Sequence, residues 1–475
     1  MRVFFVSSEA FPFSKTGGLA DMAYFLPKGL KALGHDVKVI TPYYKAIGKY
    51  HDSMHLIGRK TIQIGGLETI VNYFGLRHDD LDYIFVQNIH YFERDRLYGY
   101  PDDAERFTCF DYATLEVMDT LNVYPDILHL NDWQTGMIPY LLDEHYRDKH
   151  EGYYGIHTLL TIHNLQYQGS FAPYVSRFFN TPFNYTYMHF DHVNFLKAGI
   201  ARATKINTVS PQYRNEVLDM QYGFSLDGAL WQRKDDFTGI LNGIDDTVFH
   251  PSDDPFIEMP YSHKDVQKGK KINKEAVLHH FNLSIALDAP LIVYVGRLAH
   301  QKGIDLIAGA IEDVINHSDA LFILMGSGDA SFENFFKSLT EKYPYRIGNY
   351  IGFNEQVAHQ LYAAADLFMM PSQFEPCGLG QMIAMTYGAL PIVRETGGLK
   401  DTVIPYNKFT QEGHGFTFVG YDSKELKDKL CEAIHLYHES PHIFKKLIDH
   451  AMSKDFSTAR MSTSYEALYK TILGV

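Results

Sequence analysis

The first two dozen residues of the chain include side chains and glycines suited to binding an anion. An apolar run at residues 3–6 precedes a polar loop with Lys15, Thr16, Gly17 and Gly18, and a helical pattern of apolar residues follows. Paired glycines let backbone amides approach a ligand closely, the first amides of a helix are free to donate, and the lysine adds a full positive charge. The loop is a candidate anion site, with a tight turn and a solvated lysine as the equally weighted alternative.

A second set of cations and glycines lies in the C-terminal half. Arg297 and Lys302 bracket a loop between an expected strand and an expected helix. Two cations at such a helix start suit a diphosphate, because charge and hydrogen bonding add there. Further along, Glu375 and Cys377 precede a glycine-rich helix start, and a second TGGLxD sequence begins at Thr396. We interpret the repeated TGGLxD sequence as similar loop chemistry, not as evidence of duplication.

Polar residues follow two expected strands of the N-terminal half. Asp132 and Trp133 come after the strand at residues 127–130, and His163 and Asn164 come after the next one. The carboxyl ends of parallel strands line the ligand crevice of an open sheet, so we expect these residues on the same edge as the first loop. A hydrogen-bonded structural histidine is the alternative for His163.

The elements that position these residues alternate between strands and helices. In the second half we expect strands at residues 291–295, 321–325, 350–353 and 367–370, and helices at 303–315, 334–342 and 357–364. This regular alternation predicts a doubly wound α/β domain. The first half alternates less regularly, with strands at 3–6, 35–41, 83–87, 127–130 and 205–209 and helices at 19–33, 104–121 and 136–146. Residues 165–190 predict an irregular, aromatic-rich excursion used mainly for surface packing, with a lid or a sugar platform as the alternative.

Composition limits the class of protein. The chain has 475 residues, 45% of them hydrophobic, which is enough for two domains with substantial cores. Its net charge of −14 argues against a nucleic acid or an anionic membrane as the main partner. No apolar run approaches the roughly 20 residues that span a bilayer, and no leader precedes the first strand, so we expect neither secretion nor membrane insertion.

Cysteine and histidine usage predicts neither a disulfide framework nor a metal site. The three cysteines, Cys109, Cys377 and Cys431, are far apart and form no CxxC pair, which fits a reducing cytoplasm. The chain has no HExxH sequence and no clustered His/Cys spacing. The stretch at residues 326–329 lacks the third glycine of a dinucleotide fingerprint, so a nicotinamide cofactor is disfavoured. We therefore expect no metal and no cofactor.

Seven short sequences, in this order, resemble the bacterial glycogen synthases and plant starch synthases: KTGGLAD, NDWQTG, TIHNLQYQG, GILNGID, GRLAHQKG, FEPCGLGQ and ETGGLKD. Each is weak alone, but the ordered set spans essentially the whole chain and is specific. The resemblance implies an α/β GT-B fold, with two Rossmann-like doubly wound domains facing a deep cleft. It implies an N-terminal acceptor and catalytic domain at residues 1–243, to which residues 457–475 cross back, and a nucleotide-sugar-binding domain at residues 244–456.

The resemblance also implies site residues. Catalytic roles fall on Arg297 and Lys302 at the donor phosphates, on His163 beside the reacting carbon, and on Glu375, which orients the glucose hydroxyls. Substrate contacts fall on Lys15, Gly17, Gly18, Asp21, Asp132, Asn164, Asn242, Phe353, Cys377, Gly378, Leu379, Thr396, Gly397 and Gly398. Two positions depart from the family pattern. Asn131 stands where many members have His, and Phe353 stands where many have Tyr, so a ring can still stack on adenine but loses its hydroxyl.

The activity implied by the resemblance is transfer of glucose from ADP-glucose to the nonreducing end of an α-1,4-glucan (glycogen), with retention of configuration. The donor bond is already activated, so catalysis needs stabilisation of the leaving charge more than it needs an acid. Two carboxylates at double-displacement separation are not evident, so we expect a same-face mechanism. One alternative is another GT-B sugar-nucleotide enzyme, such as a sucrose-type synthase or an epimerase. The other is a non-catalytic glucan- or nucleotide-binding protein.

Overall fold

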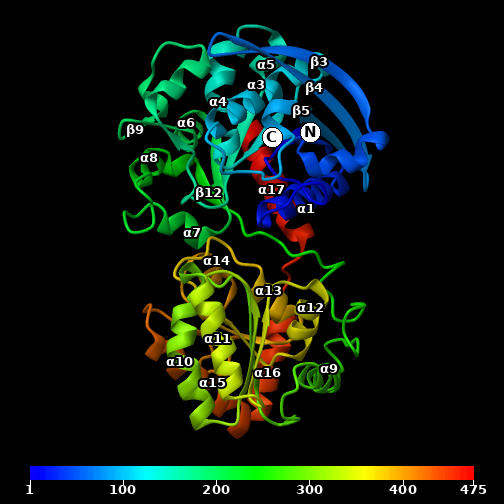
Figure 1. Cartoon of the computed structure of the whole chain (residues 1–475), viewed down its shortest axis with the longest axis vertical. Coiled ribbons are helices and arrows are strands. Elements are labelled where there is room, and N and C mark those ends of the chain that lie inside the picture. The colour runs from blue at the N-terminus through cyan, green and yellow to red at the C-terminus, as the bar shows by residue number, and fades with distance from the viewer. The chain divides into compact units, whose positions relative to one another are not determined.

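The computed structural model describes residues 1–475, and the chain divides into two compact units (Figure 1). Unit 1 comprises Met1–Leu241 and Thr458–Val475, and unit 2 comprises Asn242–Ser457. Each unit has its own main sheet, flanked by helices, and its own hydrophobic core. No helix in the structure is both long enough and apolar enough to cross a membrane.

Unit 1 is built on a nine-stranded sheet with the order β12-β11-β7-β6-β1-β2-β5-β4-β3. Its strands are β1 (Arg2–Val6), β2 (Asp36–Pro42), β3 (His55–Ile64), β4 (Leu67–His78), β5 (Leu81–Gln87), β6 (Ile127–Asn131), β7 (His157–Ile162), β11 (Lys205–Thr208) and β12 (Phe237–Gly239). A small second sheet contains β8 (Ser170–Phe171), β9 (Met188–His189) and β10 (His192–Asn194). The seven strands from β12 to β5 run parallel, so their carboxyl ends share one edge.

The helices of unit 1 connect and cover these strands. They are α1 (Gly18–Ala32), α2 (Ile89–Phe92), α3 (Asp103–Leu121), α4 (Ile138–Leu141), α5 (Glu151–Tyr154), α6 (Phe195–Arg202), α7 (Pro211–Glu216), α8 (Asp227–Gln232) and α17 (Thr458–Leu473). Short 3₁₀ turns are η1 (Lys45–Ser53), η2 (Trp133–Thr135), η4 (Pro173–Phe179), η5 (Tyr185–Tyr187) and η6 (Lys234–Asp236), and η3 (Leu142–Tyr146) is a π turn. The helix expected at residues 136–146 is therefore the short α4 continued by a π turn.

The β3–β4 hairpin is an antiparallel addition that the sequence analysis did not assign. Its two long curved strands form the edge of the sheet in Figure 1. Gly65 and Gly66 join the strands with φ of 56° and 82°. A two-residue turn with both φ values positive matches the twist of a hairpin, and glycine adopts it without steric cost. The nine-stranded sheet is therefore mixed, with a parallel core and an antiparallel edge.

The C-terminal helix α17 belongs to unit 1, where it packs against α1. The two helices approach closely at Gly29, where a Cβ atom would lie 2.0 Å from the Ser462 hydroxyl. Beneath α17, the Tyr469 hydroxyl lies 2.6 Å from Nδ1 of the buried His129. These contacts fix the last segment of the chain on the sheet that carries the first candidate loop.

Unit 2 is a six-stranded, fully parallel sheet with the order β15-β14-β13-β16-β17-β18. Its strands are β13 (Leu291–Val295), β14 (Leu321–Gly326), β15 (Ile347–Ile351), β16 (Leu367–Met370), β17 (Leu390–Arg394) and β18 (Phe416–Phe418). Its helices are α9 (Val266–His280), α10 (Ile304–His317), α11 (Ala330–Lys342), α12 (Glu355–Ala364), α13 (Gly380–Thr386), α14 (Gly397–Thr402), α15 (Ser423–Glu439) and α16 (Pro441–Met452), with the 3₁₀ turn η7 (His300–Lys302).

Helices cover both faces of this second sheet. Helix α10 packs with α11 and α15, while α9 packs with α12, and α13 packs with α16 (Figure 1). Several expected boundaries were wrong, and the helix expected at residues 334–342 is α11, which starts at Ala330. The strand expected at residues 350–353 is β15, which lies earlier, and the helix expected to start at Gly378 starts at Gly380 because Gly378 has φ of 77°, outside the helical region.

Candidate functional site

Three candidate segments of unit 1 lie side by side at the carboxyl edge of its sheet. The Lys15 loop follows β1, Asp132 follows β6, and His163 follows β7, and these three strands are neighbours. The parallel pairing of β1 with β6 and of β6 with β7 brings the three strand ends together. This edge is the first part of the candidate site.

The loop before α1 is held from behind by Glu9, a buried residue that the sequence analysis missed. One Glu9 carboxylate oxygen accepts hydrogen bonds from the Thr16 amide at 2.5 Å and the Gly17 amide at 3.2 Å, and the other accepts from the Thr16 hydroxyl at 2.5 Å. The Tyr98 hydroxyl also donates to Glu9, at 2.7 Å. Gly18 is exposed and its amide makes no hydrogen bond in the structure, so this amide is available to a ligand.

Lys15, the cation of this loop, forms an ion pair with Asp21. The Lys15 Nζ atom lies 2.7 Å from a carboxylate oxygen of Asp21 in the first turn of α1. The Lys15 side chain is about half exposed, with a relative accessibility of 48%. A surface pair of this kind is worth little, so an anionic ligand can displace Asp21 at small cost.

Asp132 and His163 are tied together through the backbone. The Asp132 carboxylate accepts the His163 backbone N–H at 2.7 Å and also the Asn164 backbone N–H. Burial, with a smaller contribution from the charge of Glu9, raises the pKa of Asp132 to about 7. Asp132 has φ of 56° and ψ of −172°, a sparsely populated backbone conformation that persists only where the surroundings impose it. Strain of this kind clusters at functional sites.

His163 stays neutral at physiological pH. Part of its surface is accessible, but the dense packing around the ring lowers the pKa of His163 to about 4. Its Nε2 atom lies 2.9 Å from the side-chain oxygen of Asn131. His163 can therefore position or polarise a ligand at this edge, but it does not supply a full charge.

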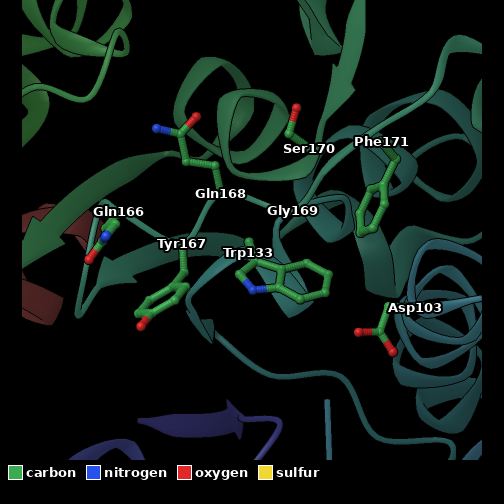
Figure 2. Close-up of a pocket in the computed structure, with 8 residues that line it drawn as sticks. All are labelled: Asp103, Trp133, Gln166, Tyr167, Gln168, Gly169, Ser170 and Phe171. Carbon is green, nitrogen blue, oxygen red and sulfur yellow. The ribbon is translucent and has the colours of Figure 1, made fainter. Parts of the chain in front are cut away.

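A pocket of about 400 Å³ lies in unit 1 next to this edge. It is lined by Asp103, Trp133, Gln166, Tyr167, Gln168, Gly169, Ser170 and Phe171. Figure 2 shows the Trp133 indole at its centre, with the Tyr167 and Phe171 rings on either side in this view. A Cβ atom on Gly169, which has φ of 60°, would lie 2.3 Å from the Trp133 ring. Residues of the irregular excursion thus form an aromatic pocket with polar groups around it, a surface suited to sugar rings.

In unit 2, the candidate residues gather at the carboxyl ends of β13 and β16. The Lys302 Nζ atom lies 2.6 Å from Oε2 of the buried Glu375, and the Ser372 hydroxyl donates to the same oxygen at 3.0 Å. Arg297 is exposed, and its guanidinium donates to the Gln301 side chain at 3.2 Å. The structure therefore places a paired lysine and a largely free arginine at one helix start, where a diphosphate could bind.

The loop after β16 packs against the turn after β17 through contacts between their backbones. The Gly398 amide donates to the backbone oxygens of Glu375 at 3.1 Å and Pro376 at 3.2 Å. A Cβ atom on Gly397 would lie 2.0 Å from the Glu375 oxygen, and one on Gly398 would lie 2.1 Å from the Cys377 oxygen. Thr396, the N-cap position of α14, is buried beside them. These glycines are required for packing.

The remaining expected contacts occupy different surroundings in unit 2. Cys377 is buried, which raises the pKa of its thiol to about 12, and it lies near the backbone of Asn242. The Asn242 side-chain oxygen is buried without a hydrogen-bond partner. Leu379 comes directly before α13. Phe353 follows β15 and is 75% exposed, so its ring is free to stack on a ligand.

Sequence reasoning missed Glu9, Tyr98 and most of the aromatic pocket as functional residues. Apart from Asp103 and Trp133, the pocket residues lie in the excursion at residues 165–190, which was expected to serve mainly surface packing, with sugar stacking as the stated alternative. The sequence around Glu9 gave no signal that its carboxylate would accept hydrogen bonds from the loop, and its other partner, Tyr98, lies 89 positions away along the chain. No group of three or more His, Cys, Asp or Glu side chains in the structure is arranged to hold a metal ion.

Comparison with known proteins gives full-length matches. Residues 2–232 match the family described as starch synthase catalytic domain, and residues 278–448 match glycosyl transferases group 1. A glycogen synthase from Acholeplasma laidlawii is 62% identical over 475 residues, which cover 100% of this chain and 99% of the relative. Another from Anoxybacillus flavithermus is 44% identical over 479 residues, covering 100% of this chain and 98% of the relative.

Solved structures give the same result at the level of the fold. The catalytic domain of starch synthase IV from Arabidopsis thaliana, bound to ADP and acarbose, matches with a TM-score of 0.88 and 32% identity, covering 100% of this chain and 99% of that one. A sucrose-phosphate synthase from Thermosynechococcus elongatus matches with a TM-score of 0.62 at 17% identity, covering 100% of this chain and 99% of that one, which shows a shared fold alone. The expected family and the expected GT-B fold are confirmed. The chain belongs to the glycogen synthases, glycosyltransferases of the GT-B fold.

Proposed function

We propose that the enzyme transfers glucose from ADP-glucose to the nonreducing end of an α-1,4-glucan, with retention of configuration. The family supplies the reaction class, a sugar-nucleotide donor and a glucan acceptor. The choice of ADP rests on the starch synthase IV structure, which contains ADP and acarbose. In this proposal residues 1–243 and 457–475 bind the acceptor and act in catalysis, and residues 244–456 bind the nucleotide sugar.

The observation that carries the proposal is the cationic helix start of unit 2. Lys302 is held by the buried Glu375 and is therefore placed before a ligand arrives, whereas Arg297 is exposed, donates only to Gln301 and stays available to a ligand. Cations fixed in advance stabilise the developing charge of a leaving diphosphate without reorganising during the reaction. Glu375 keeps a further acceptor oxygen for a sugar hydroxyl, since Lys302 and Ser372 both bind its Oε2 atom.

The edge of unit 1 is assigned to the transferred glucose and the acceptor. His163 and Asp132 act at the glucose, and the Gly18 amide with Lys15 acts at the donor phosphates. The aromatic pocket around Trp133 and Tyr167 binds the glucan, because flat rings cover the apolar faces of sugars. Water exclusion by this pocket limits hydrolysis of the donor.

The reaction proposed is a same-face displacement. The bond from the anomeric carbon to the diphosphate breaks, the acceptor hydroxyl bonds to that carbon on the same face, and its proton passes to the leaving phosphate oxygen. The chain's residues bind and orient both substrates, and the cations offset the leaving charge. Phe353 stacks on adenine. The three free cysteines are consistent with a protein that works in the reducing cytoplasm.

The test is nucleoside diphosphate release from ADP-glucose and from UDP-glucose, each with and without glycogen. The proposal expects release that requires glycogen and is strongly faster with ADP-glucose. Equal rates with both donors would refute the assignment of ADP. Release that does not require glycogen would point to another acceptor, as in a sucrose-type synthase, and tight binding of ADP-glucose without release would indicate a non-catalytic binding protein.

A further inference from the structure

Asn131 is a buried residue whose two side-chain ends face different groups. It is the last residue of β6, directly before Asp132, and it is fully buried. Its amide nitrogen donates to the backbone oxygen of Val6 at 2.9 Å, and its amide oxygen lies 2.9 Å from Nε2 of His163. No other donor reaches that amide oxygen in the structure. Asn131 thus links β1 to the residue after β7.

The orientation of the Asn131 amide follows from chemistry. The Val6 carbonyl is an acceptor only, so it requires the amide nitrogen of Asn131 on its side. Turning the amide over would place two oxygen atoms face to face and leave buried groups unpaired, which is costly. The amide oxygen must therefore face His163.

The orientation of the amide decides which imidazole nitrogen carries the proton. An oxygen at 2.9 Å from Nε2 is satisfied only if that nitrogen is a donor. The packing around the ring keeps His163 neutral, so the ring has a single N–H group. Its Nδ1 atom then has a lone pair, and no hydrogen bond in the structure uses that atom.

We propose that Asn131 fixes His163 as the tautomer with its proton on Nε2, so that Nδ1 is offered as a hydrogen-bond acceptor to a hydroxyl group of the transferred sugar. The second half of this statement rests on the proposed function. The sugar hydroxyl donates and the imidazole accepts, so no proton is transferred. Asn131 is a positioning residue in this scheme, because it acts only through His163.

Histidine tautomers can be measured directly. In full-length protein labelled with ¹⁵N-histidine, NMR correlations through two bonds distinguish a protonated from an unprotonated ring nitrogen. The signals that vanish in His163→Gln identify His163 among the 24 histidines of the chain. At neutral pH the wild type should show Nε2 protonated alone, and Asn131→Ala should show a mixture. A proton on Nδ1 in the wild type, or an unchanged single tautomer in Asn131→Ala, overturns the proposal.

Kinetics with donors that lack one sugar hydroxyl test the acceptor role of Nδ1. The wild type should lose about tenfold in kcat/KM with one monodeoxy donor, the size expected for one hydrogen bond. Asn131→Ala should lose about tenfold with the complete donor and little more with that monodeoxy donor. Fully additive losses would show that the residue and the hydroxyl act separately, which overturns this half of the proposal.

A rescue variant separates positioning from simple loss of structure. In Asn131→His, one imidazole nitrogen can donate to the Val6 oxygen while the other accepts from His163. This variant should restore the single tautomer and most of the activity lost in Asn131→Ala. Melting temperatures of both variants measure the cost of the lost Val6 contact. Restored stability without a restored tautomer counts against the proposal.

The two proposals fail in distinguishable ways. If the wild type released no nucleoside diphosphate from any nucleotide sugar, the proposed function would be wrong, yet the NMR result would still decide the tautomer. If the wild type turned over normally and the tautomer did not depend on Asn131, only the present inference would be wrong.

Discussion

The chain contains the sequence TGGLxD twice, and the two copies do opposite work. In unit 1 the glycines Gly17 and Gly18 are exposed, and a Cβ atom on either would meet nothing within 4 Å. In unit 2 the glycines Gly397 and Gly398 are buried, and a Cβ atom on either would lie about 2 Å from a backbone oxygen. The first copy leaves open space beside its glycines, while the second lets two protein loops pack together. The TGGLxD sequence alone therefore does not indicate whether a loop is open or packed against another loop.

The largest expected difference comes from matched alanine substitutions at Gly398 and Gly18. Gly398→Ala places a methyl group 2.1 Å from the backbone oxygen of Cys377, so two loops must move apart. We expect a loss of about 4 kcal/mol in the free energy of unfolding. Gly18→Ala lies in the open first turn of a helix, where alanine is favoured, and should add up to about 1 kcal/mol. Chemical denaturation of both variants measures the contrast.

The substitution at Gly18, which spares stability, should nevertheless reduce activity. Gly18→Ala should lower kcat/KM although the protein stays stable, because the added methyl group would stand where the donor phosphates are proposed to bind. Equal loss of stability in both variants would show that the two loops are packed alike, and full activity in Gly18→Ala would remove the first loop from the donor site.

The candidate cations of the two units should differ next. Lys302 is paired with the buried Glu375, whereas Lys15 pairs with Asp21 at the surface. Lys302→Ala should lower kcat/KM by about 100-fold and also destabilise the protein, since a buried carboxylate loses its partner. Lys15→Ala should leave the free energy of unfolding within about 1 kcal/mol of wild type. Steady-state kinetics and thermal unfolding on the same samples test both statements.

Arg297→Ala is the control for these lysine variants. Arg297 is exposed and holds only Gln301, so its loss should lower kcat/KM by orders of magnitude with the melting temperature near wild type. Near-normal turnover in Arg297→Ala would contradict the diphosphate assignment, whatever happens to stability.

Glu9 gives the first loop a rigid support that the second loop obtains from backbone packing. Glu9→Ala removes the carboxylate that accepts hydrogen bonds from the Thr16 amide, the Thr16 hydroxyl and the Gly17 amide. Such bonds are worth about 1.5–3 kcal/mol each, so kcat/KM should fall by about 10- to 100-fold as the loop loosens. Tyr98→Phe removes one donor to Glu9 and should cost less. Kinetics with ADP-glucose measures both, and an unaffected kcat/KM in Glu9→Ala would show that the loop needs no support.

The raised pKa of Asp132, a residue of unit 1, predicts that both stability and kcat/KM depend on pH. Its pKa of about 7 lies above the ordinary value of 3.8, so the folded protein binds this proton more tightly than the unfolded chain. Stability from this group is therefore greatest below pH 3.8 and is lost as pH rises from 3.8 to about 7. If the carboxylate is the active form, kcat/KM should be about tenfold lower at pH 6 than at pH 8. Asp132→Asn should abolish the pH dependence of stability and that of kcat/KM. If kcat/KM of this variant still changes near pH 7 as in the wild type, the change must come from another group.

How far the sequence predicts this molecule depends on the distance between interacting residues. The strands β13 and β16 are buried on both faces, so each is a continuous apolar run followed by loop residues, and both were predicted with the observed bounds. The same local signal located Asp132 and His163 at strand ends. The β3–β4 hairpin was missed although Gly65 and Gly66 separate its strands, because polar and apolar residues alternate poorly there.

Pairings between distant residues could not be predicted. Lys302 and Glu375 are 73 positions apart, and neither motif indicates that one neutralises the other. Glu9 lies near its loop in sequence, but no local pattern indicates that a carboxylate shortly after a strand will accept hydrogen bonds from the amides of the following loop. The difference between the open and the packed TGGLxD loops depends on what surrounds each one, and the sequence of the loop itself does not contain that information.

The smallest expected effect is at Cys377, whose backbone, rather than its thiol, packs against the second TGGLxD loop. The Cys377 backbone oxygen accepts from Gln381 and lies where a Gly398 methyl group would clash, while the thiol is buried. Cys377→Ser should therefore cost about 1 kcal/mol of stability for burying a hydroxyl and change kcat/KM by less than about threefold. In the wild type the thiol should react slowly with alkylating agents, because burial raises its pKa to about 12. Abolished turnover with an unchanged melting temperature would show that the sulfur contacts the substrate, and the loop after β16 would then bind ligand through a side chain as well as pack against the second TGGLxD loop.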